Sequence, residues 1–384
     1  MTTTFQVQII DGIGAHSGMQ AYNKSLAGAL EAGGLHPSIY SNYLDDRYGN
    51  SLGWILPNFY VGSIVGNVWR MLACGRQVFR FAKRVDGEQT WWLLHFHGAT
   101  LGNLVLFLAL SLASKRNRIG LIVHDVTSVH RRENAFVRAI KTLFYRHAPR
   151  LMIVHSAIAA EQLQAMGYRR ALMHAVLFRM SDANVPPPQH IDDAALAAVL
   201  QSKRRRFLLF GSIRASKGLD TVLSALRQLP QQARDATLVV VAGRDSGGII
   251  GSPGHEIPGD GSVALLDRFI SNEERGALFA SADLVLLPYR SIYQSGVLDV
   301  AVTNRVPVLA SDLPTFRQFF ADFPSFGRVY GSDASQLAEA ILDELSKDAG
   351  SRPSYTEDDV ARYTASDPAL SFADDLRAAM KRLG

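Results

Sequence analysis

Short apolar runs alternate with stretches of helical amphipathic spacing along the whole chain. In the first half, strand-like runs cover residues 5–10, 91–96, 119–123 and 151–154. The last three lack polar alternation, as expected for parallel strands buried on both faces. A glycine loop and an amphipathic stretch that begins near residue 17 follow the first run. The first half is therefore predicted to repeat a strand, loop and helix unit.

The pattern lapses at residues 181–205, where three consecutive prolines are incompatible with a regular strand or helix. It resumes with strand-like runs at residues 207–210, 238–241, 263–265, 284–287 and 306–309 and helical runs between them. We therefore predict fold class α/β, with two doubly wound Rossmann-like domains that face a cleft. The predicted boundaries are 1–180 for the first domain, 181–205 for a linker, 206–365 for the second domain and 366–384 for a helix that packs back toward the first domain.

Length and composition agree with two ordinary globular domains, because 384 residues exceed what one core usually supports. The single cysteine, Cys74, excludes an intramolecular disulfide, and the first ten residues indicate a buried strand and no signal peptide, so we expect a cytoplasmic protein. The densest apolar run, residues 101–112, is shorter than the roughly twenty residues that cross a bilayer, and we expect a buried helix there. The net charge of +5 calls for an anionic partner, but no zinc, helix-turn-helix or RNP-type signature indicates nucleic acid.

The clearest chemical signal lies at residues 208–226, LLFGSIRASKGLDTVLSAL. A strand ends in Gly211, and the loop before the next helix carries Arg214 and Lys217. Two cations at the carboxyl edge of a sheet suit a diphosphate, whose negative charge grows when it leaves a substrate. An ordinary basic loop before a helix is the alternative.

A second segment, residues 282–311, strengthens the diphosphate interpretation. Its strand ends at a proline, and Ser295 and Gly296 then open a helix whose free N–H groups form an anion site. Gly243 and Arg268 end the two intervening segments and are candidates to hold a nucleoside. A plain turn at Gly243 and a solvated charge at Arg268 are the alternatives.

The first domain offers a glycine-rich loop and a set of histidines. In the loop at residues 11–18, Gly14 is the candidate for close backbone approach to a ligand, although the loop lacks the GxGxxG spacing and a tight turn would explain it as well. His97, His124 with Asp125, and His155 end three neighbouring strand-like runs. Their spacing lacks the paired ligands of a zinc site, whereas neutral histidine can bond sugar hydroxyls. We expect His155 to be a satisfied polar residue.

The ordered motifs IRASKGLD, VVVAG, LLDRFISNEE and DLVLLPYRSIYQSGVLDVAVTNRVPVLASD resemble the donor half of family 4 glycosyltransferases, the retaining enzymes of the GT-B fold. The resemblance covers residues 207–312, with weaker agreement over residues 1–180. It implies a polysaccharide-assembly type of enzyme that uses a nucleoside-diphosphate sugar, with no cofactor and no metal. It implies an acceptor-binding first domain and a nucleotide-sugar-binding second domain.

The same resemblance assigns roles to individual residues. Arg214 and Lys217 would act on the diphosphate, and His124 would lie near the donor sugar as an active-site histidine. It also implies donor contacts at Gly14, Ser295, Gly296 and Val297. The residue pattern adds Gly211, Gly243, Arg268 and Asp299 as candidates for the donor, and His97 and Asp125 as candidates for contact with the acceptor or the sugar.

One departure from the family pattern concerns sugar recognition. Many members carry two glutamates seven residues apart around the turn before the helix, and this chain has neither. The first position falls near Ile292 or Tyr293 and the second near Asp299 or Val300. Asp299 can accept hydroxyl hydrogen bonds in place of the second glutamate, or it can be an ordinary helix-surface aspartate.

Two basic amphipathic stretches, residues 64–84 and 131–150, fall in the first domain. Such helices can lie at an anionic membrane surface, or can dock their apolar faces on the sheet. We therefore expect peripheral association with the inner face of the cytoplasmic membrane and a glycan or polyprenyl-diphosphate-linked saccharide acceptor, as in exopolysaccharide or cell-surface glycan synthesis. The alternatives are a nucleotide-sugar epimerase of similar architecture and a non-catalytic nucleotide-sugar-binding relative.

Overall fold

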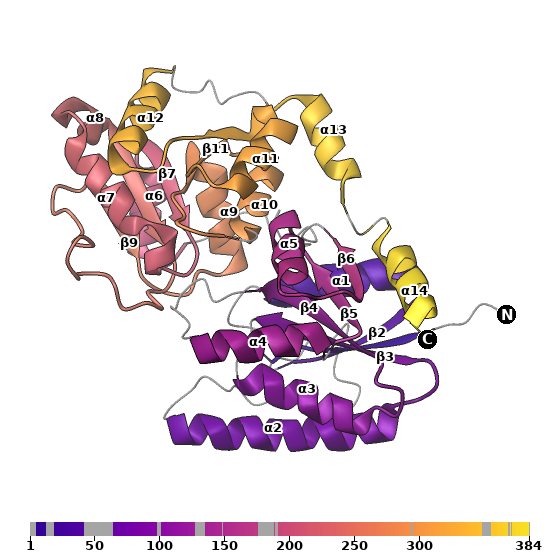
Figure 1. Cartoon of the computed structure of the whole chain (residues 1–384). Coiled ribbons are helices and arrows are strands. Elements are labelled where there is room, and N and C mark those ends of the chain that lie inside the picture. Colours follow the sequence, from indigo (N-terminus) through magenta and orange to yellow (C-terminus); the bar gives the residue numbers. More distant parts are fainter. Residues whose placement is uncertain are drawn as a thin grey trace. The chain divides into compact units, whose positions relative to one another are not determined.

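The computed structural model describes residues 5–12, 19–41, 64–97, 101–126, 135–147, 149–175, 188, 191–292, 295–347, 355–367, 369 and 371–383. The chain forms two compact units (Figure 1). Unit 1 comprises Met1–Ser181 with Asp367–Gly384, and unit 2 comprises Asp182–Ser366.

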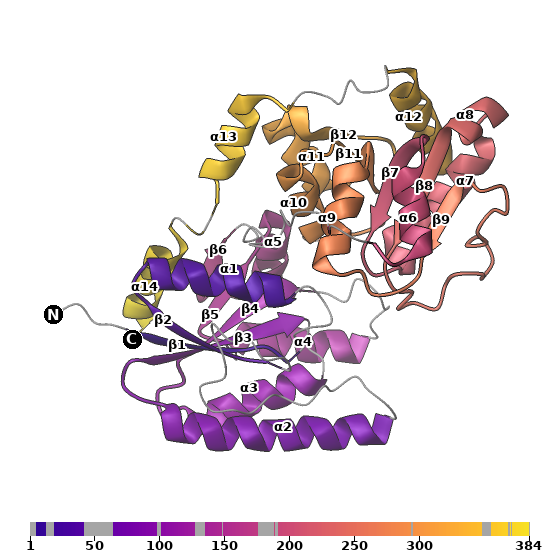
Figure 2. The same cartoon turned by 180° about the vertical axis from the view of Figure 1, so that it is seen from behind.

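Unit 1 contains a parallel six-stranded sheet with the order β2-β1-β3-β4-β5-β6. Its strands are β1 (Gln6–Ile10), β2 (His36–Tyr40), β3 (Thr90–His97), β4 (Ile119–Asp125), β5 (Leu151–Val154) and β6 (Ala171–His174). Its helices are α1 (Met19–Ala32), α2 (Ile64–Val85), α3 (Leu101–Ala113), α4 (Ala135–His147), α5 (Ala157–Ala165) and α14 (Phe372–Leu383). Figures 1 and 2 show α1 and α14 on one side of this sheet and α2, α3 and α4 on the other.

The core on the α1 side of the unit 1 sheet follows from strand alternation. On this face, alternate residues of β1, β3 and β5 are apolar and fully buried up to the polar row at the strand ends, including Ile9, Leu93 and Ile153. Helix α14 closes this core with Phe372 and Leu376, and the Arg150 guanidinium donates to the Leu383 carbonyl at 3.2 Å. The C-terminal helix is therefore part of unit 1.

Unit 2 contains a second parallel six-stranded sheet, with the order β12-β11-β10-β7-β8-β9. Its strands are β7 (Arg205–Phe210), β8 (Thr237–Ala242), β9 (Val263–Leu266), β10 (Leu284–Leu287), β11 (Val308–Ala310) and β12 (Gly327–Val329). Its helices are α6 (Ala194–Gln201), η2 (Ala215–Lys217), α7 (Leu219–Gln228), α8 (Gln231–Ala236), α9 (Asn272–Ser281), α10 (Gly296–Thr303), α11 (Pro314–Asp322), η3 (Pro324–Phe326), α12 (Ala334–Ser346) and α13 (Glu357–Ala365). Two doubly wound Rossmann-like sheets confirm the predicted fold class.

The segment 181–205, which we expected to be a linker, contains helix α6. Asp193 caps this helix by accepting a hydrogen bond from the Leu196 N–H at 2.8 Å. Leu196 and Val199 are buried, and α6 packs against β9 and α9. Helix α6 therefore belongs to the packing of unit 2.

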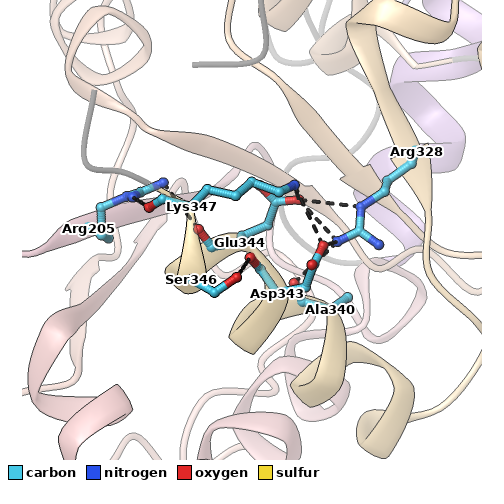
Figure 3. Close-up of polar contacts among 7 residues, drawn as sticks. All are labelled: Arg205, Arg328, Ala340, Asp343, Glu344, Ser346 and Lys347. Carbon is cyan, nitrogen blue, oxygen red and sulfur yellow. Dashed lines mark hydrogen bonds and ion pairs between the residues drawn. The ribbon is translucent and has the colours of Figure 1, made fainter. Parts of the chain in front are cut away.

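A buried carboxylate fastens helix α12 to the sheet of unit 2 (Figure 3). Glu344 accepts hydrogen bonds from Arg328 of β12 at 3.0 Å and from Lys347 at 2.6 Å, and its side chain is only 8% exposed. Arg205 of β7 donates to the Lys347 carbonyl at 3.2 Å and so satisfies one of the free carbonyls at the helix end. The network joins the first and last strands of unit 2 to one helix terminus.

Helix α3 differs from the buried helix expected at residues 101–112. Leu106 and Leu110 are fully buried, but Leu101, Leu108 and Leu112 are 55%, 57% and 68% exposed. The expected helix is present, and one stripe of it packs inward while the opposite stripe is exposed. Within the described residues, no helix combines the length and the apolarity needed to cross a membrane.

Candidate functional site

The carboxyl ends of β7, β8 and β10 meet at one edge of the unit 2 sheet, because these strands are parallel neighbours or flank a common neighbour. The loop after β8 touches the loop after β7: a Cβ on Gly243 would lie 2.1 Å from the Gly211 carbonyl oxygen. The loop after β7 also touches the end of β10, since a Cβ on Gly218 would lie 1.9 Å from the Pro288 carbonyl oxygen. Both glycines have positive φ, 144° and 71°, so no other residue fits either contact without a shift of the backbone.

Lys217 lies at the end of η2 and reaches over the β10 side of this edge. Its Nζ is 3.7 Å from the centroid of the Tyr289 ring, a cation–π contact. Tyr289 is 2% exposed, and its carbonyl accepts from the Ser311 hydroxyl at 2.5 Å. The ammonium is therefore supported by a fixed ring, and it forms no hydrogen bond or ion pair with another described residue, so it can contact an anion.

Arg214 lies on the same loop but leans toward the β8 side. Its Nε donates to the Ser246 hydroxyl at 2.9 Å, and the side chain is exposed. The two predicted cations thus stand on either side of the glycine contact between Gly211 and Gly243.

The start of helix α10 faces the end of β7. A Cβ on Gly211 would lie 3.7 Å from Val297 Cγ2, which is ordinary van der Waals distance. Ser295 caps the helix by accepting from the Leu298 N–H at 3.2 Å. Gly296 and Val297 are half-buried, so the first turn of this helix comes beside the loop of Lys217.

Asp299 lies on the inner side of α10. It is 6% exposed and accepts a hydrogen bond from the Tyr363 hydroxyl of α13 at 2.7 Å. Its carboxylate therefore joins α10 to α13, and a contact with a ribose stays a prediction. Ile292, one of the two positions where the family carries its first glutamate, is half-buried, and Tyr293 lies outside the described residues.

Arg268 follows β9 and pairs with two carboxylates. Its guanidinium contacts Asp193 at 2.8 Å and Glu274 at 2.7 Å. These hydrogen bonds raise the pKa of Arg268, with Glu274 as the largest cause. The side chain clamps the N-terminus of α6 to that of α9, and its predicted nucleoside contact remains untested by this geometry.

The loop after β8 contains a fold element that the sequence interpretation missed. The Asp245 carboxylate accepts from the N–H groups of Gly247, Ile249 and Ile250 at 3.1, 3.1 and 2.9 Å. Burial acts to raise the pKa of Asp245, but the N–H donors, Ile250 foremost, outweigh it and hold the pKa below its usual value. An aspartate two residues after a strand-ending glycine was the available signal.

In unit 1, four adjacent strands end in a polar side chain on the face covered by α1. The apolar alternation of β1, β3, β4 and β5 continues in register to Asp11, His95, His124 and His155. All four are less than 9% exposed. Asn23 of α1 donates to Asp11 at 2.8 Å, which fastens the helix to the first member of the row.

The three histidine rings surround Tyr22 of α1. Its ring centroid lies 5.4 Å from that of His95, 5.2 Å from that of His124 and 5.4 Å from that of His155. His95 and His124 stack at 5.1 Å, with 2.8 Å between His95 Nδ1 and His124 Nε2. Tyr22 lies in the amphipathic stretch that begins near residue 17 and was not among the predicted site residues.

Hydrogen bonding fixes the protons of two rings. His155 Nδ1 lies 2.8 Å from the Ala175 carbonyl and must donate, which leaves Nε2 to accept from the Tyr22 hydroxyl at 3.0 Å. His155 is thus satisfied at both nitrogens, as expected. Burial, assisted by His155, lowers the pKa of His95 to about 3, so His95 is neutral.

A neutral His95 carries one ring proton. Its Nε2 is buried and has no partner among the described residues. Placing the proton on Nδ1, where it donates to His124 Nε2, avoids an orphaned buried donor. This arrangement puts the proton of a neutral His124 on Nδ1.

Three predicted residues lie partly or wholly beyond the description. Gly14 falls in residues 13–18, outside the described residues. His97 and Asp125 end β3 and β4, but their side chains are likewise outside the description. Among the described side chains, no group of histidine, cysteine or carboxylate residues could hold a metal ion.

Comparison with known proteins gives the class. Sucrose-phosphate synthase from Thermosynechococcus elongatus superposes with a TM-score of 0.70 at 16% identity, covering 98% of this chain and 100% of that one. HepE of Anabaena in complex with UDP-glucose gives 0.66 at 13% identity, covering 98% and 99%. A protein assigned as a UDP-N-acetylglucosamine 2-epimerase from Listeria monocytogenes gives 0.54 at 16% identity, covering 90% and 88%. No curated protein sequence matches the chain.

These likenesses show a two-domain fold of the GT-B type. Residues 204–347, the greater part of unit 2, match the family model described as Glycosyl transferases group 1. Over these residues the chain is therefore similar to a group 1 glycosyltransferase domain, and the protein is a glycosyltransferase.

Proposed function

We propose that the enzyme transfers a sugar from a nucleoside-diphosphate sugar bound at the carboxyl edge of the unit 2 sheet. The observation that carries this proposal is the meeting of the Lys217 loop, the Gly211–Gly243 backbone contact and the start of α10 at one edge. A fixed cation and the free N–H groups of a helix start both favour a diphosphate. HepE, which shares this fold, was crystallised with UDP-glucose and so provides the first donor to test.

Each element of this edge has a chemical role. Lys217 and Arg214 compensate the charge that the diphosphate gains as it leaves, and both approach from the β7 loop. Gly211 and Gly243 leave backbone exposed without side chains, so that phosphates can come close. Ser295 to Val297 supply N–H groups for the same charge.

The histidine row of unit 1 supports a role for His124 at the sugar. His95 fixes the His124 ring by stacking and by a hydrogen bond to Nε2, and an imidazole held in one orientation suits a sugar hydroxyl. We propose a family 4-like retaining reaction in which the leaving diphosphate assists deprotonation of the acceptor hydroxyl. The proposed acceptor is a glycan or a polyprenyl-diphosphate-linked saccharide of exopolysaccharide or cell-surface glycan synthesis.

Calorimetric titration with UDP, GDP and dTDP tests the donor site directly. The Lys217→Ala variant is expected to bind the preferred nucleotide about tenfold or more weakly, because a hydrogen bond to a charged group contributes about 1.5–3 kcal/mol. Lys203→Ala is the matched control, since Lys203 is exposed and precedes β7 at the opposite, amino edge of the same sheet. Equal affinities for all three proteins would refute the proposed diphosphate site.

Product analysis by NMR separates the reaction classes. With donor and acceptor present, the anomeric configuration of the donor sugar should be retained in the product. Conversion of the sugar without any acceptor would identify an epimerase. Nucleotide binding with neither transfer nor conversion would identify a non-catalytic relative.

A further inference from the structure

Six of the eight large apolar side chains that are strongly exposed in the described residues lie on three helices of unit 1. They are Trp69 and Leu72 on α2, Leu101, Leu108 and Leu112 on α3, and Leu143 on α4. We call these six residues, with the basic residues of the same helices, the α2–α3–α4 face. Figures 1 and 2 show α3 between α2 and α4 on one side of the sheet.

The exposed apolar side chains of α3 are aligned in a stripe along the helix and are not scattered singly. Leu101, Leu108 and Leu112 are spaced by seven and four residues, which puts them on one side of α3, opposite the buried Leu106 and Leu110. Exposed apolar side chains are common singly, but a contiguous apolar stripe usually marks a contact surface.

Helix α2 combines two apolar positions with a basic stripe. Trp69, Leu72, Arg76, Arg80 and Lys83 follow each other at intervals of three or four residues and are all exposed. Within the described part of the chain, the three basic residues of this stripe pair with no carboxylate. The stripe is therefore apolar toward the helix start and positive toward its end.

The packing of α2 on α3 holds the two stripes together. A Cβ on Gly75 of α2 would lie 2.6 Å from Val105 Cγ1 of α3, so the helices approach closely at that point. On the other flank, Phe107 of α3 meets Phe144 of α4 edge to face at 5.0 Å. Helix α3 therefore contacts α2 on one flank and α4 on the other.

The charge of the three helices indicates which kind of partner contacts the α2–α3–α4 face. Helices α2, α3 and α4 contain no aspartate or glutamate, whereas α2 alone carries five Lys and Arg residues. Apolar stripes on a group of helices that carries positive and no negative side chains fit the boundary between the headgroups and the acyl chains of an anionic bilayer. Tryptophan and snorkelling Lys or Arg side chains suit the same boundary.

We infer that the α2–α3–α4 face docks the enzyme on the surface of a bilayer that contains anionic phospholipid. Trp69 and the leucines of α3 enter the interface, and the basic end of α2 contacts the headgroups. The inference goes beyond the transfer reaction and stands without it, because docking needs neither donor nor acceptor.

Vesicle sedimentation tests the inference on the full chain. The wild type should sediment with vesicles of phosphatidylcholine mixed with phosphatidylglycerol, should bind phosphatidylcholine alone much more weakly, and should be released by salt. The double variant Leu108→Glu/Leu112→Glu should partition about tenfold or more weakly, because two buried apolar contacts are replaced by negative charges. Arg76→Gln/Arg80→Gln should weaken binding about fivefold for each charge removed.

The matched control is Phe269→Glu in unit 2. Phe269 is 68% exposed, as is Leu112, so the single variant Leu112→Glu is its counterpart in charge and in exposed area. Urea denaturation followed by tryptophan emission verifies that unit 1 of each variant is folded, because all four tryptophans lie in that unit, and nucleotide affinity verifies the same for unit 2. The control should bind vesicles like the wild type.

Three results would overturn the inference. The first is absence of the wild type from anionic vesicles, and the second is equal sedimentation of the wild type and the Leu108→Glu/Leu112→Glu variant. The third is a wild-type oligomer in analytical ultracentrifugation that this variant converts to a monomer, which would make the face an interface between two copies of the chain.

Discussion

Replacing His95 with asparagine removes a titratable ring from the interior of unit 1. His95 is 1% exposed, and its Nδ1 shares a proton with His124 Nε2 at 2.8 Å. The asparagine amide nitrogen can take the place of Nδ1, so the variant keeps a donor toward His124 but loses the group that titrates. The change therefore isolates the pH dependence that this ring contributes to stability.

The magnitude follows from the lowered pKa of His95. The ring has a pKa of about 3 in the folded protein and an ordinary value of 6.5 in the unfolded chain, mainly because burial disfavours the charged form. Between these values the unfolded chain binds more protons, so stability rises with pH in this window and is lost as the pH falls from 6.5 toward 3. At pH 5 the contribution of His95 to this loss is about 2 kcal/mol.

Urea denaturation followed by tryptophan emission measures this difference in unit 1 alone. All four tryptophans of the chain lie between residues 54 and 92, inside unit 1. The free energy of unfolding is compared between pH 8 and pH 5 for the wild type, His95→Asn and His36→Asn. His36 is exposed on β2, so its replacement should leave the wild-type profile unchanged.

The wild type should lose about 2 kcal/mol more than His95→Asn between the two pH values. Parallel profiles for these two proteins would refute the conclusion that His95 is buried and neutral. This holds also where His95→Asn is less stable than the wild type by the same amount at both pH values. Such a result would show a loss of packing, which does not depend on pH.

Two further predictions concern unit 2. Glu344→Ala should destabilise it by about 1–2 kcal/mol, because Arg328 and Lys347, which are 43% and 37% exposed, lose a carboxylate that is 8% exposed. Asp343→Ala should cost less than about 1 kcal/mol, because Asp343 is 54% exposed. Calorimetric unfolding measures both. Gly218→Ala should lower the midpoint of the same transition and weaken nucleotide binding together, since a Cβ there strikes the Pro288 carbonyl, and an unchanged variant would contradict the contact between the β7 loop and β10.

The strands that the sequence predicted are those in the interior of the two sheets. Apolar runs marked β1, β3, β4 and β5, and in unit 2 β7, β8, β10 and β11 as well as the edge strand β9. The missed strands β2, β6 and β12 all lie at sheet edges. An edge strand is half-exposed, as the patterns of β2 and β12 show, so it lacks the continuous apolar run that buried parallel strands display.

Some site residues could be predicted from their spacing in the sequence, whereas others come together only through tertiary packing. The positions of Lys217, Arg214 and Ser295 after their strands could be read from spacing, because the carboxyl ends of parallel strands share one edge. The contact of Lys217 with the Tyr289 ring and the cluster of histidines around Tyr22 could not be predicted from spacing, because packing brings together residues that are far apart in the sequence. The available signal for Asp11 was the alternation of apolar residues in the first strand, which continues past the strand end and places Asp11 on the same face as the histidines.

The difference between the two units has a physical basis. In unit 2 the edge is shaped by backbone contacts: Gly243 against Gly211, and Gly218 against Pro288, where any Cβ would strike main-chain atoms. Such contacts restrict the residue type at each position, so a recognisable pattern of sequence results, and the family match falls on residues 204–347. In unit 1 the edge is shaped by side-chain rings around Tyr22, and side-chain packing tolerates many combinations of residues. The site of unit 1 is therefore recognised from the three-dimensional arrangement of its side chains, and the sequence alone predicts little of it.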